Sequence, residues 1–251
     1  MVAKIFIDGE AGTTGLQIRE RLAGRRDLEV LSIAQDKRKD QDERKRLLNA
    51  ADVAILCLPD DAAKESVRLI ENDTTRVIDA STAHRVAEGW AYGFAEMDPG
   101  QTEAIAKARY VANPGCWPQG LIAAARPLVE ARLLPADYPL SYHGISGYTG
   151  GGRQMVEDYV AQGDKASQYM PYALTFEHKH LPEMQAYAKL NRAPLFEPLV
   201  GNFAQGMSTS LPIHLDMVAD IPSGKDLHAA LSDFYAAIPD SFVRVAPYDP
   251  T

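Results

Sequence analysis

The sequence predicts an α/β protein, in which a mostly parallel sheet with helices on both faces is followed by a second, α+β domain. Short apolar stretches alternate with helical stretches over the first 115 residues, and this rhythm changes after Cys116. Of the 251 residues, 46% are hydrophobic and 24% are charged, which is typical of a globular chain with one large or two modest domains. We therefore expect domains at residues 1–115 and 116–251.

The first domain is defined by strands that end at turn signals and by the helices between them. Strands are predicted at Val2–Asp8, Leu28–Ile33, Val53–Leu58 and Arg76–Asp79. Helices are predicted at Leu16–Leu22, at the end of the charged stretch Asp36–Arg46, and at Ala62–Ile70. Strands and helices that alternate at this spacing indicate parallel pairing with right-handed crossovers.

The second domain has longer and less regular segments. A helix is predicted from Pro118 to about Leu133 and a strand from Pro139 to Ser146. Met207–Met217 alternates or runs apolar like a strand, and Lys225–Ala237 has the apolar stripe of an amphipathic helix. This mixture predicts an α+β arrangement.

Charge and cysteine content exclude several classes of protein. Lys and Arg number 26 against 34 Asp and Glu, and the resulting net charge of −8 opposes a general affinity for nucleic acid. Two cysteines, one of them (Cys57) in an apolar stretch, do not form a disulfide framework and favour a reducing compartment. Neither a signal segment nor an apolar run near eighteen residues occurs. We expect a cytoplasmic protein that does not bind membranes.

A glycine-rich turn lies between the first predicted strand and helix. Gly9, Gly12, Thr13, Thr14 and Gly15 occupy the position where a dinucleotide pyrophosphate rests on backbone N–H groups at a helix N-terminus. The spacing G-x-x-G-x-x-G departs from the usual G-x-G-x-x-G, so a merely tight strand-to-helix turn is the alternative. With its context, the turn predicts a Rossmann-type nucleotide-binding domain.

The end of the second predicted strand indicates which dinucleotide is preferred. An NAD enzyme places an acidic residue there to bind the ribose 2′-hydroxyl, whereas this chain has Ser32 followed by the basic Lys37 and Arg38. These residues would accept a 2′-phosphate, so NADP is expected over NAD. Asp36 lies in the same stretch, and an ordinary solvated loop is the alternative.

Cys116 is the candidate nucleophile. It follows Asn113-Pro114-Gly115 and precedes a helix whose first turn is marked by Pro118, which would place its thiolate in the positive field of the helix N-terminus. A thiol of pKa near 8.5 is only a few per cent ionised at neutral pH, so such a field favours nucleophilic catalysis. A buried structural cysteine is the alternative, and we assign that role to Cys57.

His180 is the candidate general acid and base. It lies in Glu177-His178-Lys179-His180-Leu181-Pro182, where the proline predicts an irregular segment able to present side chains into a cleft, and we expect it close to Cys116. A surface or core histidine is the alternative for any single histidine. No other cysteines or histidines cluster with the pair, so no metal site is expected.

These motifs together resemble the shorter type of N-acetyl-gamma-glutamyl-phosphate reductase, in the semialdehyde dehydrogenase superfamily. The resemblance extends in order over almost the whole chain, and its Asn-Pro-Gly-Cys and His-Lys-His-Leu-Pro elements are its most specific parts. The motifs that carry it are Gly9–Gly15, Asp79–Arg85, Tyr92-Gly93, Asn113–Cys116, Ser146–Arg153 and His178–Glu183.

The resemblance implies a fold, a reaction and a set of site residues. The fold is a Rossmann domain plus a glyceraldehyde-phosphate-dehydrogenase-like α+β domain, in a homo-oligomer of two or four chains. Cys116 forms a thioester with an acyl phosphate of arginine biosynthesis, NADPH reduces it, and His180 transfers the proton. The residues implied to contact the substrate are Ser81, Arg85, Asn113, Ser146, Gly147 and Arg153.

Two further readings are left open. Family members usually continue beyond the equivalent of Thr251 with a strand and helix that return to the nucleotide domain, so the sequence is also compatible with a catalytically silent NADP-binding module. An aspartate-semialdehyde dehydrogenase-like acyl-phosphate reductase is the nearest enzymatic alternative, because no side chain reads the N-acetyl group unambiguously.

Overall fold

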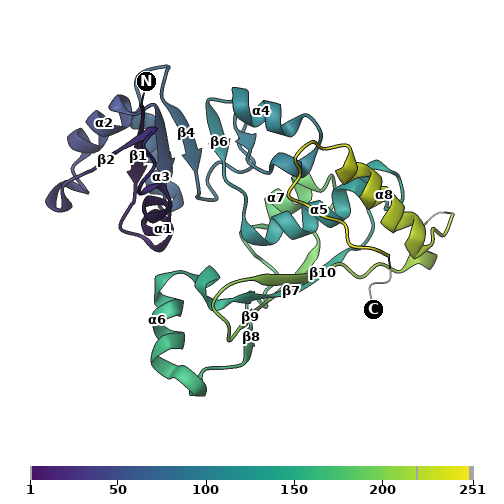
Figure 1. The fold of residues 1–251 in the computed structure, drawn as a ribbon. Coiled ribbons are helices and arrows are strands. Elements are labelled where there is room, and N and C mark those ends of the chain that lie inside the picture. Colours follow the sequence, from purple (N-terminus) through teal and green to yellow (C-terminus); the bar gives the residue numbers. More distant parts are fainter. Residues whose placement is uncertain (1, 219, 249–251) are drawn as a thin grey trace. The chain divides into compact units, whose positions relative to one another are not determined.

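The fold was obtained as a computed structural model that describes residues 2–218 and 220–248, without the side chain of Thr13. The chain divides into two compact units (Figure 1). The first comprises the chain up to Gly93 together with Glu103–Pro114, and the second comprises Phe94–Thr102 and the chain from Gly115 onward. The predicted domain limits of 1–115 and 116–251 differ from this grouping at residues 94–102 and at Gly115. As limits of independently folding domains they stay a prediction.

A six-stranded sheet forms the first unit, in the order β2-β1-β3-β4-β6-β5 and parallel throughout. Its strands are β1 (Ala3–Asp8), β2 (Leu28–Leu31), β3 (Val53–Leu56), β4 (Arg76–Asp79), β5 (Ala91–Tyr92) and β6 (Tyr110–Ala112). The register places Ile5 beside Val30 on one side and Val53 on the other. The predicted parallel sheet is therefore confirmed, with β5 and β6 added to the predicted strands.

Helices connect the strands of this sheet. They are α1 (Thr13–Leu22), α2 (Gln41–Ala50), α3 (Asp60–Leu69), the short η1 (Gln35–Lys37) and α4 (Gln101–Lys107), which begins in the second unit. Helix α2 begins where the Asp40 carboxylate accepts a hydrogen bond from the Glu43 N–H, at 3.0 Å. Right-handed crossovers place α1 on one face of the sheet and α2 with α3 on the other. Phe6, Leu48 and Leu56 are among the residues that pack between sheet and helices.

The second unit has a four-stranded mixed sheet in the order β10-β7-β9-β8. Its strands are β7 (Ser141–Gly147), β8 (Tyr169–Pro171), β9 (Leu195–Gly201) and β10 (Met207–Ser210). Only β7 and β9 are parallel to each other among these pairs, as an α+β arrangement requires. The strand predicted over 207–217 ends at Ser210, and the short helix η5 (Leu215–Met217) follows it.

Helix α5 (Cys116–Glu130) is packed against the buried face of this second sheet. The Trp117 and Phe196 rings meet edge to face with centroids 5.4 Å apart, and the Tyr142 hydroxyl donates to the Trp117 carbonyl at 2.8 Å. A Cβ at Gly144 would lie 2.9 Å from the Trp117 ring, so a glycine is needed where the helix approaches the strand. The other helical elements of the unit are η2 (Ala95–Met97), η3 (Tyr148–Gly151), α6 (Arg153–Gln162), η4 (Gly163–Lys165), α7 (Leu181–Tyr187) and α8 (Gly224–Ala236).

Candidate active site

The glycine turn of the first unit has the geometry that a dinucleotide requires. Gly9 has φ +91°, and a Cβ there would lie 2.3 Å from the Cys57 carbonyl oxygen, so only glycine fits between the ends of β1 and β3. A Cβ at Gly15 would lie 2.6 Å from the Gly9 carbonyl oxygen, so the third glycine lets α1 fold back on the turn. Gly12 is the N-cap of α1, and Thr14 is exposed in its first turn. The side chain of Thr13 lies outside the described residues.

A cavity of about 520 Å³ opens beside this turn. Its walls include the turn itself, Ile33 after β2, the basic side chains Arg38 and Lys39, and Cys57 and Leu58 after β3. The carboxyl edge of a parallel sheet, next to a glycine turn and a helix N-terminus, is where dinucleotides bind in open α/β sheets. The position of this cavity and the basic groups that line it therefore fit a dinucleotide.

Basic side chains cluster around Glu10 of the glycine turn, and one of them, Arg38, also lines the cavity. Arg19 of α1 donates to Glu10 and, at 3.2 Å, to the Ser32 hydroxyl, and the Arg38 guanidinium lies 3.9 Å from the Glu10 carboxylate. Ser32 and Arg38, both predicted to bind the cofactor, are thus linked through Arg19 and Glu10, and sequence reasoning missed Arg19. Lys37 is exposed in η1.

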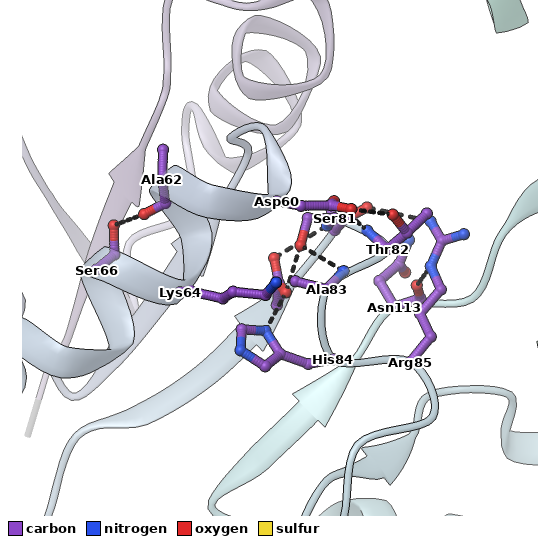
Figure 2. A network of polar contacts seen from close by, with 12 residues as sticks. Asp60, Ala62, Lys64, Ser66, Ser81, Thr82, Ala83, His84, Arg85 and Asn113 are labelled. Atoms are coloured by element: carbon purple, nitrogen blue, oxygen red, sulfur yellow. Dashed lines mark hydrogen bonds and ion pairs between the residues drawn. The ribbon is translucent and has the colours of Figure 1, made fainter. Parts of the chain in front are cut away.

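The motif Asp79–Arg85 forms a buried polar network at the carboxyl end of β4 (Figure 2). Asp79 is fully buried, and its carboxylate accepts hydrogen bonds from the Ser81 hydroxyl at 2.7 Å and the Ser81 N–H at 2.9 Å. The same carboxylate lies 2.6 Å from Nδ1 of His84, whose ring stacks on Trp90 with centroids 4.0 Å apart. Asp79 therefore fixes Ser81 and the orientation of His84.

Arg85 ties this network to the turn that precedes Cys116 (Figure 2). Its Nε donates to the Asn113 carbonyl at 3.0 Å, and its Nη2 donates to the Ala80 carbonyl at 3.2 Å. Arg85 is 7% exposed, while Asn113 is exposed. The structure thus groups three of the residues predicted to contact substrate, and Arg85 supports the backbone of two adjacent turns.

Cys116 is the first residue of α5, and its side chain is exposed. The preceding residue, Gly115, is the N-cap, and its N–H donates to the Glu183 carboxylate at 3.0 Å. Cys116 therefore lies at the positive end of a fifteen-residue helix, which favours the thiolate form. Sequence reasoning missed Glu183, although it is part of the His178–Glu183 motif and is only 2% exposed.

The negative charge of Cys116 contributes to the raised pKa values of two tyrosines, Tyr142 and Tyr172. Burial raises the pKa of Tyr142 to about 12, and the negative charge of Cys116 adds to that effect. Burial also raises the pKa of Tyr172, again with a contribution from Cys116. The Tyr172 hydroxyl accepts a hydrogen bond from Trp117 Nε1 at 2.8 Å. Both hydroxyls are therefore protonated at neutral pH beside the cysteine.

His180 is 6% exposed and is the N-cap residue of α7. The irregular segment that the sequence predicts ends at His180, because Pro182 lies in the first turn of α7. Proline is tolerated there, since an N–H in the first turn of a helix has no partner within the helix. The His178 ring meets the His180 ring at 4.6 Å and the Tyr172 ring at 5.9 Å. Tyr172 thus contacts His178 and is influenced by the charge of Cys116, and all of these residues belong to the second unit.

The remaining predicted substrate residues lie at and after the end of β7. Ser146 is 9% exposed, and a Cβ at Gly147 would lie 2.6 Å from the Ala204 carbonyl oxygen, so the following turn packs closely on the loop after β9. Arg153 is exposed and pairs with Glu157 one turn along α6, at 2.7 Å. The hydrogen bond that Arg153 donates to the Glu157 carboxylate raises the pKa of Arg153.

Within residues 2–218 and 220–248, no group of three or more His, Cys, Asp or Glu side chains is arranged to hold a metal ion. In the same part of the chain, no helix is both long and apolar enough to cross a membrane.

Comparison with known proteins identifies the family. The family described as "Semialdehyde dehydrogenase, NAD binding domain" matches residues 4–107, and "Semialdehyde dehydrogenase, dimerisation domain" matches residues 116–250. Among solved structures, aspartate semialdehyde dehydrogenase from Francisella tularensis is similar with a TM-score of 0.64 at 12% identity, covering 92% of this chain and 80% of that chain. The same enzyme with NADP from Candida albicans gives a TM-score of 0.61 at 14% identity, covering 93% and 77%. These two likenesses confirm the fold.

Sequence relatives define the family more closely. The N-acetyl-gamma-glutamyl-phosphate reductases of Mesorhizobium japonicum and of a Chelativorans species are 65% and 64% identical over 248 residues, covering 99% of this chain and 80% of theirs. That of Brucella anthropi is 54% identical over 253 residues. The chain therefore belongs to the N-acetyl-gamma-glutamyl-phosphate reductase family of semialdehyde dehydrogenases.

Proposed function

We propose that this chain uses NADPH to reduce N-acetyl-gamma-glutamyl phosphate to N-acetylglutamate 5-semialdehyde and phosphate. The reaction is a step of arginine biosynthesis, and we propose that it takes place in the cytoplasm. The relatives that share about two thirds of its residues over 99% of the chain bear the name of this activity. The single structural observation that supports it best is an exposed cysteine at the first position of a long helix, in the same unit as the His178–His180 pair.

Covalent catalysis begins at Cys116. The thiolate forms a bond to the acyl carbon, the bond from that carbon to the phosphate oxygen breaks, and phosphate leaves with the electron pair and takes up a proton. When bound, NADPH supplies a hydride to the thioester carbon. Backbone N–H groups at the start of α5 are placed to stabilise the negative oxygen of the resulting hemithioacetal.

His180 handles the proton of the second half-reaction. It protonates the hemithioacetal oxygen and recovers that proton as the carbon–sulfur bond breaks, which releases the aldehyde and restores the thiolate. The near-complete burial of His180 and its contact with His178 restrict its ring to one orientation, which general acid–base catalysis requires. His178 packs against Tyr172 and Phe196, so we assign it a supporting role.

The substrate residues proposed from the sequence fall into two groups. Ser81, Arg85 and Asn113 form one connected network in the first unit, whereas Ser146, Gly147 and Arg153 follow β7 in the second unit. Arg153 carries the more accessible guanidinium, and its fork geometry suits the phosphate or the carboxylate of the substrate. Arg85 holds backbone carbonyls, so its proposed effect on the substrate runs partly through the Asn113 turn.

The cavity beside the glycine turn, which Gly9, Gly12 and Arg38 line, supports the cofactor site proposed from the sequence. Gly9, Gly12 and Gly15 with Thr13 and Thr14 would take the pyrophosphate, and the groups after β2 would take the ribose. Ser32, Lys37 and Arg38 provide positive charge or hydrogen bonds there with no acidic residue at the end of β2, which favours NADP over NAD.

The chain is proposed to work as a homo-oligomer of two or four copies. The family that matches residues 116–250 is a dimerisation domain. Its sheet leaves apolar side chains exposed, such as Leu195 at 52%, Tyr169 at 62% and Met170 at 40%. Light scattering of the purified chain tests this: a monomer at micromolar concentration would contradict the proposal.

The decisive assay for the activity is NADPH oxidation by this polypeptide with N-acetyl-gamma-glutamyl phosphate, or the reverse reaction with the semialdehyde, NADP and phosphate. Aspartyl phosphate serves as the matched alternative substrate, because an aspartate-semialdehyde dehydrogenase would prefer it. Preferential turnover of the N-acetylated substrate is expected. Preference for aspartyl phosphate, or cofactor binding with no turnover of either substrate, would contradict the proposed function.

A further inference from the structure

A buried ion pair forms part of the wall of the cavity beside the glycine turn. Asp8, the last residue of β1, directly precedes Gly9 and is 4% exposed, and Arg44 of α2 is 7% exposed. The Arg44 guanidinium donates to Asp8 Oδ2 from Nη2 at 3.1 Å and from Nε at 3.3 Å. Asp8 and Arg44 both line the cavity. The pair therefore adjoins the turn that is proposed to bind the pyrophosphate of the dinucleotide.

The hydrogen bonds of Arg44 commit its guanidinium to the protein. Besides Asp8, it contacts the Glu65 carboxylate from Nη1 at 3.1 Å and the Ser66 hydroxyl from Nη2 at 2.7 Å. The Ser66 hydroxyl in turn lies 2.7 Å from Asp8 Oδ2. A guanidinium has about five N–H donors, and these four hydrogen bonds use nearly all of them. Arg44 is therefore placed to compensate carboxylates and not to bind a phosphate itself.

The carboxylate of Asp8 opposes the binding of an anion at this cavity. Like charges repel more strongly where the surroundings are less polar than water, and a pyrophosphate is anionic. The charge of Asp8 is felt at the cavity wall: burial, together with the carboxylates of Asp79 and Asp8, raises the pKa of Cys57, which also lines the cavity. Binding of a pyrophosphate beside Asp8 thus requires a cation that offsets this charge, and Arg44 is in direct contact with it.

We propose that Arg44 is a positioning residue of the cofactor site, which offsets the charge of Asp8 and thereby lets the glycine turn accept the pyrophosphate of a dinucleotide. This inference rests on the proposed function, since it assumes that a dinucleotide binds at this turn. NADPH and NADH share the pyrophosphate, so Arg44 controls the affinity for both and not the choice between them.

A pair that stabilises only the fold is the competing explanation, because removal of one partner of a buried ion pair is destabilising in itself. The two explanations differ in what they predict for Asp8→Asn. If the pair serves only the fold, this change leaves cofactor binding unchanged or weakens it. If Arg44 offsets the charge of Asp8, the same change removes the group that opposes the pyrophosphate, and binding becomes tighter.

Dissociation constants for NADPH and NADH, measured by fluorescence titration of the full chain, separate the explanations. Arg44→Met is expected to raise both constants about 10- to 100-fold, because it leaves a buried carboxylate without its cation, and to keep their ratio within about twofold of the parent's. Asp8→Asn should lower both constants about two- to fivefold. The double variant Asp8→Asn/Arg44→Met should lie within about threefold of the parent.

Arg46→Met is the matched control. Arg46 belongs to the same helix, but its side chain is 61% exposed and pairs with Glu43. This variant should bind both dinucleotides as the parent does.

Loss of affinity for both dinucleotides in Arg44→Met, together with its recovery in the double variant, supports the inference. If the parent chain binds NADPH but Asp8→Asn does not tighten binding, or if Arg44→Met weakens NADPH alone, the inference is wrong while the proposed function stands. Should Arg44→Met fail to fold, Asp8→Asn decides by itself. If the parent chain binds neither dinucleotide, the proposed function fails and the inference fails with it.

Discussion

The two cysteines of this chain follow parallel strands and precede helices, yet their surroundings differ in every respect that controls thiol chemistry. Cys57 comes directly after β3, three residues before α3 begins, and is half-buried. Cys116 comes four residues after β6, is itself the first residue of α5, and is exposed. The comparison teaches that position relative to the helix start, and not the strand-to-helix context alone, decides whether a cysteine can act as a nucleophile.

Electrostatics reinforce this difference. Burial, together with the nearby carboxylates of Asp79 and Asp8, raises the pKa of Cys57 to about 11. Cys116 instead lies at a helix N-terminus, which stabilises an anion. The backbone carbonyl of Cys57 also packs closely against Gly9 of the glycine turn, where it leaves no room for a side chain.

Replacement of each cysteine gives the largest expected contrast. Cys116→Ser should lower turnover by about 10⁴-fold or more and retain NADPH binding, because a hydroxyl without a strong base does not form the acyl-enzyme. Cys57→Ser should change turnover by less than about threefold. Steady-state kinetics and cofactor titration measure both, and turnover of Cys116→Ser within tenfold of the parent would remove the covalent mechanism.

Replacement of the histidines sharpens the comparison on the side of Cys116. His180→Asn should lower turnover by about two to four orders of magnitude, since the proton of the hemithioacetal loses its carrier. His178→Asn should have a much smaller effect, because that ring packs against Tyr172 and Phe196. Rate profiles against pH test the assignment, and equal losses in the two variants would mean that the wrong histidine was chosen.

Alkylation compares the two thiols directly. With a pKa of about 11, Cys57 is ionised to only about one part in 10⁴ at pH 7, and its reactivity should rise with pH up to about 11 because the thiolate is the reactive form. Cys116 should be alkylated at least about 100-fold faster at pH 7. Iodoacetamide labelling followed by peptide mass spectrometry gives both rates, and comparable rates at pH 7 would break the proposed contrast.

Glu183 gives the smallest of these effects. Glu183→Gln replaces a charged acceptor of the Gly115 N–H with a neutral one, a change worth about 1 kcal/mol, so turnover should fall about fivefold. The exposed Glu177→Gln, on the segment before α7, is the control and should leave turnover unchanged. If both variants behave like the parent, the carboxylate of Glu183 does not position the cysteine.

Much of the fold was predictable because its signals are local. Strand β4 has the predicted bounds Arg76–Asp79, and α8 differs from its predicted bounds by one residue at each end. Strand β9 was missed because Glu197 and Pro198 interrupt the apolar run within it. Helix α7 was missed for a related reason: Pro182 was interpreted as a sign of irregular structure, whereas the first turn of a helix accepts proline.

Within the candidate site, the sequence could suggest only residues whose side-chain type is itself characteristic of catalysis. Cys116 and His180 could be proposed from motif context, but Tyr172, Glu183 and Arg19 could not. The contacts that give them meaning join segments far apart in the chain, as the 3.0 Å hydrogen bond between Gly115 and Glu183 does. No local pattern marks a tyrosine or a glutamate as a neighbour of a cysteine more than fifty positions away.

The most direct test of the central claim is to trap the covalent intermediate. The chain is incubated with N-acetyl-gamma-glutamyl phosphate in the absence of NADPH, quenched in acid and digested, and the peptides are weighed by mass spectrometry. The acyl group is expected on the peptide that contains Cys116 and not on that of Cys57, and later addition of NADPH before the quench should remove it. Normal turnover with no acylated Cys116, or with the acyl group on another residue, would contradict the account.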